Sequence, residues 1–161
     1  KIYIIGPQGS GKTSLAKKIS KRLNIKDFSL DDIYWKKKYT IKRNDLDKKR
    51  LLSKILSKNK KWIIEGISSS FVNKAIKQAD LVIWLDLDQK LLSFRIIKRS
   101  FKSMVRGNET ISGLKLLLRE IKEYKNRGGM YKKHKNLLMR INKKYIILKN
   151  KREIKEFLKS I

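Results

Sequence analysis

The sequence of 161 residues contains no cysteine, so disulfide bonds, cysteine metal ligands and cysteine nucleophiles are all excluded. It also lacks any apolar run near the roughly 20 residues that a membrane-spanning helix requires. The apolar residues 2–5 are far too few for the core of a signal peptide. These absences predict a cytoplasmic protein in a reducing compartment, with no membrane among its partners.

Acidic residues are scarce, because only 14 Asp and Glu accompany 43 Lys and Arg, which gives a formal net charge of +29. Such an excess favours binding to nucleic acid. The lysines, however, are spread through the whole chain, and no helix-turn-helix, zinc finger or similar module is recognisable. We therefore favour a solvated lysine-rich surface, which would associate with nucleic acid only non-specifically, over a dedicated nucleic-acid site.

Glycine is also infrequent, yet three of the eight glycines fall within residues 6–13, GPQGSGKT, which satisfy every position of the G-x-x-x-x-G-K-[ST] phosphate-binding motif. An apolar run precedes this stretch and an amphipathic helical pattern follows it, as the motif requires. A triphosphate needs many converging hydrogen-bond donors, and glycines at these positions let backbone N–H groups approach it closely. The stretch therefore predicts nucleotide binding.

The motif also assigns roles to single residues. Lys12 would contact the β- and γ-phosphates, and the Thr13 hydroxyl would ligate Mg²⁺, so ATP and Mg²⁺ are the expected cofactors. The expected nucleotide-binding residues of the loop are Gly6, Gly9, Ser10, Gly11, Lys12, Thr13 and Ser14.

Carboxylates follow several of the expected strands. A short second strand within residues 26–32 would end in Asp31 and Asp32, and the apolar residues 62–64 end at Glu65. Since ligands of open parallel sheets lie beyond the carboxyl ends of the strands, Asp31 or Asp32 should face the phosphate loop. The pattern leaves open which of the two does so, and a helix-capping or loop role is the alternative for the other.

A helix expected over about residues 89–105 places four cations on one stripe, Arg95, Lys98, Arg99 and Lys102. Phosphoryl transfer needs such cations, and the planar forks of the two arginines suit phosphate. For the two lysines, a solvated face is an equally good interpretation. His134, the only histidine, is expected at the surface.

Strands alternate with helical patterns along the chain, which predicts one doubly wound α/β domain. The expected strands lie near residues 2–5, 26–32, 62–64, 81–85 and 144–148. The polar residues 106–113 would form a mobile flap or a simple connection, and residues 127–129 would interrupt or bend a helix.

Taken together, these segments resemble the P-loop nucleoside monophosphate kinase-like proteins, and most closely the adenylate kinase-related DNA topology modulation proteins. The resemblance rests on the phosphate loop, residues 30–35, 62–66, 80–86 and 146–150, and the spacing of Arg95 and Arg99. It implies a three-layer P-loop NTPase fold with a five-stranded parallel sheet in the order 2-3-1-4-5. A small helical lid near residues 100–113 would belong to a single kinase-like domain, residues 1–161.

The resemblance further implies an ATP-dependent kinase that transfers the γ-phosphoryl group to a small acceptor, a nucleoside monophosphate or a hydroxyl metabolite. Lys12, Arg95, Arg99, Asp31 and Asp32 would be its catalytic residues. Asn150 would lie in the loop that borders adenine, and Thr13 and Glu65 would form the metal site.

The sequence departs from the related kinases at two positions. Glu65 stands where they commonly have Asp, and residues 67–69 replace a Pro-Arg pair that grips the acceptor phosphate, so another cation such as Arg43 would have to substitute. The net charge of +29, together with the family that the chain resembles, gives an alternative function: a nucleotide-dependent nucleic-acid-binding regulator, a DNA topology modulation protein with slow ATPase activity.

Overall fold

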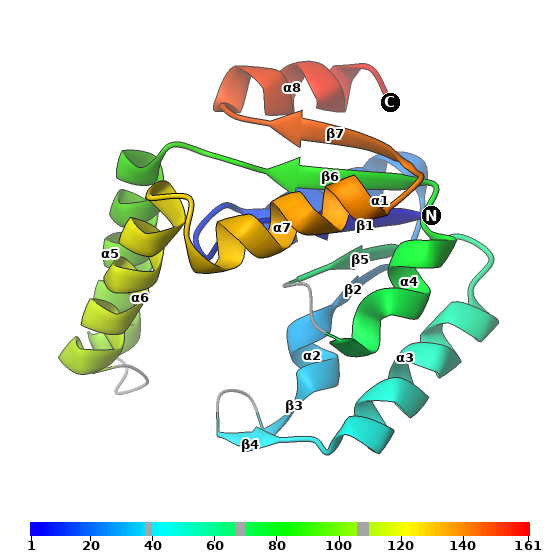
Figure 1. Ribbon diagram of the computed structural model, residues 1–161, viewed down its shortest axis with the longest axis horizontal. Coiled ribbons are helices and arrows are strands. Elements are labelled where there is room, and N and C mark those ends of the chain that lie inside the picture. Colours follow the sequence, from blue (N-terminus) through cyan, green and yellow to red (C-terminus); the bar gives the residue numbers. More distant parts are fainter. Residues whose placement is uncertain (38–39, 67–69, 106–109) are drawn as a thin grey trace.

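The computed structural model describes residues 1–37, 40–66, 70–105 and 110–161. Within them, five parallel strands form one sheet in the order β2-β5-β1-β6-β7 (Figure 1). The strands are β1 (Ile2–Ile5), β2 (Asp27–Ser29), β5 (Ile63–Glu65), β6 (Leu81–Leu85) and β7 (Lys144–Leu148). Numbered among themselves, these strands have the order 2-3-1-4-5, which confirms the expected P-loop topology.

Helices cover both faces of the sheet. They are α1 (Lys12–Leu23), α2 (Leu30–Tyr34), α3 (Asp45–Lys58), α4 (Asn73–Gln78), α5 (Gln89–Val105), α6 (Ile111–Lys125), α7 (Gly129–Arg140) and α8 (Lys151–Lys159). A 3₁₀ turn, η1 (Ser70–Val72), precedes α4, and β3 (Trp35–Lys37) pairs with β4 (Ile41–Lys42) in a small antiparallel hairpin. None of the described helices has the length and apolar character needed to cross a membrane.

The central strands are apolar on both sides because each face of the sheet has its own core. Tyr3 and Ile5 of β1 are buried against the side covered by α3, α4 and α7. Ile2 and Ile4 are buried against the side covered by α1, α5 and α8. The alternation of side chains along a strand therefore produces the three layers that the resemblance implies.

Strand β2 ends earlier than the sequence suggested. Only Asp27–Ser29 are extended, and Asp31 and Asp32 lie in the first turn of α2. The Ser29 side chain accepts a hydrogen bond from the Asp31 N–H, which caps this short helix. The expectation of a strand reaching residue 32 was wrong, because a local serine cap begins a helix there.

The helices α5 and α6 lie side by side at one end of the molecule (Figure 1). Residues 100–105, the first half of the expected lid, continue α5 without a break, and residues 111–113 begin α6. The middle of the expected flap, residues 106–109, lies outside the described residues. A lid that closes therefore stays a prediction.

The interruption expected at residues 127–129 is confirmed, because α6 ends at Lys125, α7 begins at Gly129, and Arg127 has a left-handed φ of 54°. The surface position expected for His134 is wrong. Its side chain is fully buried and packs edge-on against Trp84 at 5.9 Å between ring centroids. Burial lowers the pKa of His134 to about 4, with a smaller contribution from the charge of Lys12.

Candidate functional site

The phosphate loop occupies the turn between β1 and α1, and its glycines are required by its geometry. Gly6 has φ 155° and Gly9 has φ 74°, a region that side chains with a Cβ atom rarely adopt. A Cβ atom on Gly6 would lie 2.8 Å from the Leu85 carbonyl oxygen, and one on Gly9 would lie 3.0 Å from Ile96. The loop can therefore pass this closely under β6 and α5 only with glycine at both positions.

Lys12 begins α1 and turns its ammonium group back over the loop. Its Nζ donates hydrogen bonds of 2.9 Å to the carbonyl oxygens of Gly6 and Pro7. Burial lowers the pKa of Lys12 to about 8, and the positive charge of Arg99 acts in the same direction. The charges of Glu65 and Asp31 oppose this shift, which places both carboxylates near the ammonium group.

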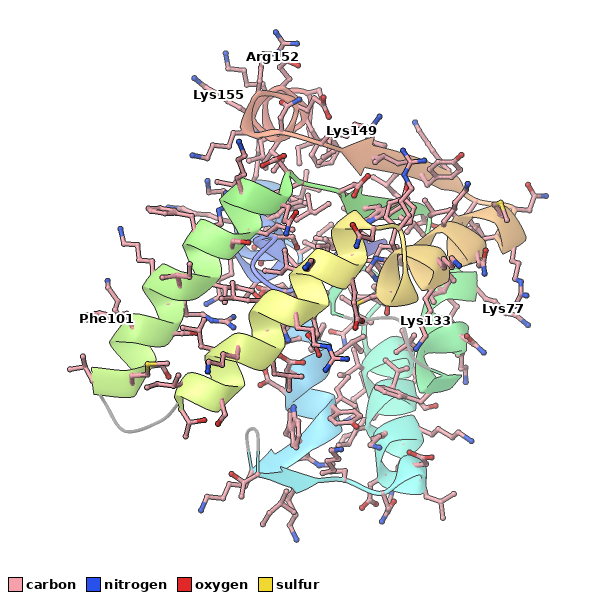
Figure 2. All side chains as sticks on the ribbon, turned by 60° about the vertical axis from the view of Figure 1, so that its left-hand side comes forward. Lys77, Phe101, Lys133, Lys149, Arg152 and Lys155 are labelled. Atoms are coloured by element: carbon pink, nitrogen blue, oxygen red, sulfur yellow. The ribbon has the colours of Figure 1, made fainter. Side chains whose placement is uncertain are left out.

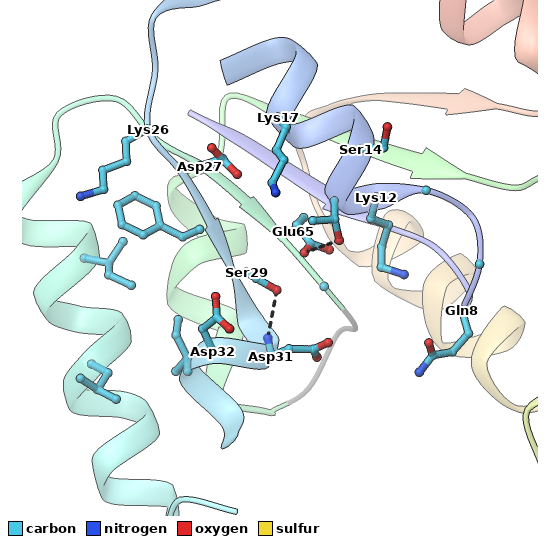
Figure 3. A pocket seen from close by; sticks show the side chains of 18 of the residues that line it. Gln8, Lys12, Ser14, Lys17, Lys26, Asp27, Ser29, Asp31, Asp32 and Glu65 are labelled. Carbon is cyan, nitrogen blue, oxygen red and sulfur yellow. Dashed lines mark hydrogen bonds between the residues drawn. The ribbon is translucent and has the colours of Figure 1, made fainter. Parts of the chain in front are cut away.

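Thr13 and Glu65 meet beside the loop, and Glu65 is labelled in Figure 3. The Thr13 hydroxyl donates a 2.9 Å hydrogen bond to Glu65 Oε1, and Glu65 is buried at the end of β5. A hydroxyl and a carboxylate are oxygen ligands of the kind that Mg²⁺ prefers. Glu65, which is one carbon longer than the aspartate expected at this position, therefore reaches the threonine directly.

These two residues fit a magnesium ion that is held mainly by phosphate and water. Among the described residues, no group of three or more His, Cys, Asp or Glu side chains could hold a metal ion by itself. Mg²⁺ commonly binds through one or two protein oxygens plus substrate phosphates and waters, so a two-residue site suffices.

Arg95 and Arg99 of α5 reach the loop from the other side. Arg95 is half-buried, and its Nη1 donates to the carbonyl oxygens of Gly9 at 3.3 Å and Ser10 at 3.1 Å. Arg99 is exposed but lines the same cavity as Lys12. The lysines of the same predicted stripe, Lys98 and Lys102, are exposed and do not line this cavity, so they form a solvated face.

Asp31 and Asp32 both line the cavity but point to different parts of it (Figure 3). The carboxylate of Asp31 points toward the phosphate loop and Lys12, which agrees with its electrostatic effect on the Lys12 pKa. The carboxylate of Asp32 turns the other way, toward the side of α3. Asp31 is therefore the aspartate that faces the phosphate loop.

The cavity has a volume of about 990 Å³ and continues from the loop into a space between β2, α2 and α3. This part of the cavity is lined by the apolar side chains Phe28, Ile33, Leu51 and Ile55, by the lysines Lys26, Lys54 and Lys58, and by Asp32. Sequence reasoning missed these lysines. Lys54 and Lys58 are one helical turn apart on α3, but that signal is weak in a chain with lysine on almost every helix.

Arg43, the proposed substitute for the missing Pro-Arg pair, also lines the cavity. Its Nη1 donates to the carbonyl oxygens of Asp32, at 2.9 Å, and of Ile33 and Trp35. These hydrogen bonds from Arg43 therefore hold the end of α2 in place. Residues 67–69, where the Pro-Arg pair would stand, lie outside the described residues.

The Asn150 side chain lines neither the cavity described above nor the one between the phosphate loop and α8. It caps α8, because its Oδ1 accepts from the Glu153 N–H at 2.9 Å and its Nδ2 donates to Glu153 Oε1 at 2.6 Å. A second cavity of about 650 Å³ instead lies between the phosphate loop and α8. It is lined by Gly9, Ser10, Gly11, Ser14, Leu15, Lys18, Arg95, Lys151, Ile154, Lys155 and Leu158.

The fold and this arrangement of loop, carboxylates and arginines define a P-loop kinase-like protein. A family model described as an AAA domain matches residues 2–112, and the chain belongs to this family. No topology modulation protein is named among the matches described here.

Two curated relatives are similar to this chain over about two thirds of its length. "Uncharacterized protein YqaC" of Bacillus subtilis (strain 168) is 34% identical over 112 residues, which are 70% of this chain and 62% of the relative. The chain thus spans about six tenths of that protein's length. A cytidylate kinase of Sulfurisphaera tokodaii is 32% identical over 124 residues, 68% of each chain.

Among solved structures, a shikimate kinase from Bacteroides thetaiotaomicron matches with a TM-score of 0.60 and 14% identity. The match covers 99% of this chain and 94% of that one. At this level of identity the match shows a shared fold.

Proposed function

We propose that the protein is an ATP-dependent phosphotransferase that moves the γ-phosphoryl group of Mg-ATP to a small acceptor. The observation that carries this proposal is the convergence of four features on one cavity: Lys12, the Thr13–Glu65 pair, the α5 arginines and Asp31. Phosphoryl transfer needs little covalent chemistry from the protein and is accelerated by positioning and charge stabilisation. These residues offer that combination.

On the donor side, backbone N–H groups of the loop and the Lys12 ammonium would hold the outer phosphates of ATP. Thr13 and Glu65 would hold Mg²⁺, which when bound neutralises charge on those phosphates. Arg95 and Arg99 would stabilise the negative charge that develops on the γ-phosphoryl group during transfer. The cavity between the loop and α8 is large enough for the adenosine part of ATP.

On the acceptor side, the space between β2, α2 and α3 combines an apolar wall with the ammonium groups of Lys26, Lys54 and Lys58. It would suit a small molecule with a ring or hydrocarbon body and an anionic group. A nucleoside monophosphate and a hydroxylated carboxylic acid both meet this description. If the acceptor is a hydroxyl, Asp31 would accept its proton, whereas a phosphate acceptor needs no base.

The direct test is a screen for ATP consumption over nucleoside monophosphates, nucleosides and small hydroxy acids. We expect one acceptor class to stimulate ADP formation in the wild type, and Lys12→Ala to lower the stimulated rate by about a hundredfold or more. Lys98→Ala is the matched control, since this exposed lysine lies outside the cavity. Equal, acceptor-independent rates in wild type and Lys12→Ala would refute the proposal.

One observation favours the second candidate, a nucleotide-dependent nucleic-acid-binding regulator. A depression of about 720 Å³ between α4 and α7 is lined by Lys77, Lys133, Arg140 and Lys143 (two of them labelled in Figure 2), with no carboxylate among the described residues of its lining. A dedicated site predicts structure-dependent binding that survives physiological salt. Weak binding that falls steeply with salt would instead indicate surface charge alone.

A further inference from the structure

Four large apolar side chains stand in line on the outer face of α5. Phe94, Ile97, Phe101 and Val105 are spaced by three, four and four residues, which places them on one side of the helix. They are between 47% and 76% exposed. Figure 2 shows Phe101 at the outer edge of the molecule, pointing away from it. We call these four residues the α5 stripe.

Among the residues that the structure describes, neither the fold nor the proposed kinase site uses the α5 stripe. The opposite side of α5 already packs on the sheet through Leu92 and Ile96, which are buried. A third side directs Arg95 and Arg99 into the cavity at the phosphate loop. Exposed apolar residues that stand singly need no explanation, but a continuous row of them marks a contact surface.

The charges around the α5 stripe indicate what kind of surface it meets. Exposed lysines, Lys90, Lys98 and Lys102, lie on the same helix, and α5 contains no Asp or Glu. The whole chain carries a net charge of +29, so a second copy of the protein would be repelled from this face. The charge complementarity therefore points to an anionic partner that also has an apolar interior into which these side chains can insert.

We propose that the α5 stripe docks onto the surface of a membrane that contains anionic lipids. The helix would lie in the plane of the interface, with its apolar row at the boundary between headgroups and acyl chains and its lysines among the headgroups. Ile111 at the start of α6 is also an exposed apolar residue. The absence of a spanning segment led us to expect no membrane partner, but a peripheral contact needs no such segment. This proposal is independent of the kinase proposal.

The first test measures co-sedimentation with vesicles of phosphatidylglycerol and phosphatidylcholine, or of phosphatidylcholine alone. We expect binding to the anionic vesicles that Phe94→Ser/Phe101→Ser weakens about tenfold or more, because two aromatic side chains that would insert into the interface are lost. The matched control is Leu46→Ser/Met139→Ser, which removes apolar residues of similar exposure from α3 and α7. Both variants keep the net charge, and thermal unfolding checks that both fold.

Two measurements distinguish insertion of the apolar side chains from binding by charge alone: the dependence of binding on salt, and the response of a dye at two different positions. At about 0.5 M salt, purely electrostatic binding should vanish, whereas stripe-dependent binding should persist in part. Because the chain contains no cysteine, Phe101→Cys and Met139→Cys can each carry one environment-sensitive dye. We expect a blue shift with anionic vesicles at position 101 and none at position 139.

Three results would overturn the proposal. The first is equal vesicle binding by the stripe variant and the control variant, which would mean that surface charge alone drives adsorption. The second is no binding to anionic vesicles at all, which would leave the surface to an acidic protein partner. The third is a dimer in light scattering that the stripe substitutions abolish, which would make the stripe an interface between copies.

Discussion

The pKa of Lys12 makes nucleotide affinity depend on pH in a way that can be calculated. Burial lowers this pKa to about 8 in the nucleotide-free protein, so the ammonium is mostly charged at pH 7 and mostly neutral at pH 9. Phosphate oxygens bind the charged form and would raise the pKa in the complex. The charged fraction falls about tenfold between pH 7 and pH 9, and the affinity for ATP should fall by the same factor.

Isothermal titration calorimetry can measure both consequences. Repeating the titration at pH 8 in buffers of different ionisation enthalpy should reveal an uptake of about half a proton per ATP bound. Lys12→Arg is the control, because a guanidinium stays charged over this range and its affinity should not change with pH. A flat profile in the wild type, or an equal fall in Lys12→Arg, would refute the placement of the Lys12 ammonium at the phosphates.

Three further predictions concern single residues. Arg99→Ala should lower turnover more than ATP affinity, and an equal loss of both in steady-state and binding measurements would show a role only in ground-state binding. Asp31→Asn should lower turnover far more than Asp32→Asn, because only Asp31 points toward the loop; identical, negligible effects would show that both carboxylates are structural. His134→Phe should stabilise the protein by about 1 kcal/mol in chemical denaturation at pH 7, because both imidazole nitrogens are buried without a partner among the described residues. The folded-state pKa of His134 is depressed, so the wild type should lose stability as the pH falls from 6.5 to about 4, and His134→Phe should lack that part of the loss.

The geometry of the phosphate loop could be predicted from the sequence because it is local. The loop from Gly6 to Thr13 depends on glycine dihedral angles and on its two flanking elements, all of which are encoded within a few residues. The sheet order was also predicted correctly, but through resemblance to a family and not through pattern alone. The pairing of Thr13 with Glu65 followed from that order, because β1 and β5 are neighbours.

The part that the sequence could not predict depends on contacts between distant segments. His134 looks like a surface residue among lysines, and only the packing of α7 against Trp84 and Tyr124 buries it. The tie between Arg43 and the end of α2 likewise depends on a hairpin, β3–β4, that periodicity does not reveal. The direction of Asp31 was set by the serine cap at Ser29, which converts an expected strand end into a helix.

The central claim is that this cavity transfers a phosphoryl group to an acceptor, and labelled ATP tests it most directly. With the γ-phosphate labelled and a stimulating acceptor present, the label should appear on the acceptor in wild type and Lys98→Ala, and should be lost in Lys12→Ala. Label released only as inorganic phosphate, at a rate that no acceptor changes, would contradict the claim and indicate a nucleotide hydrolase instead.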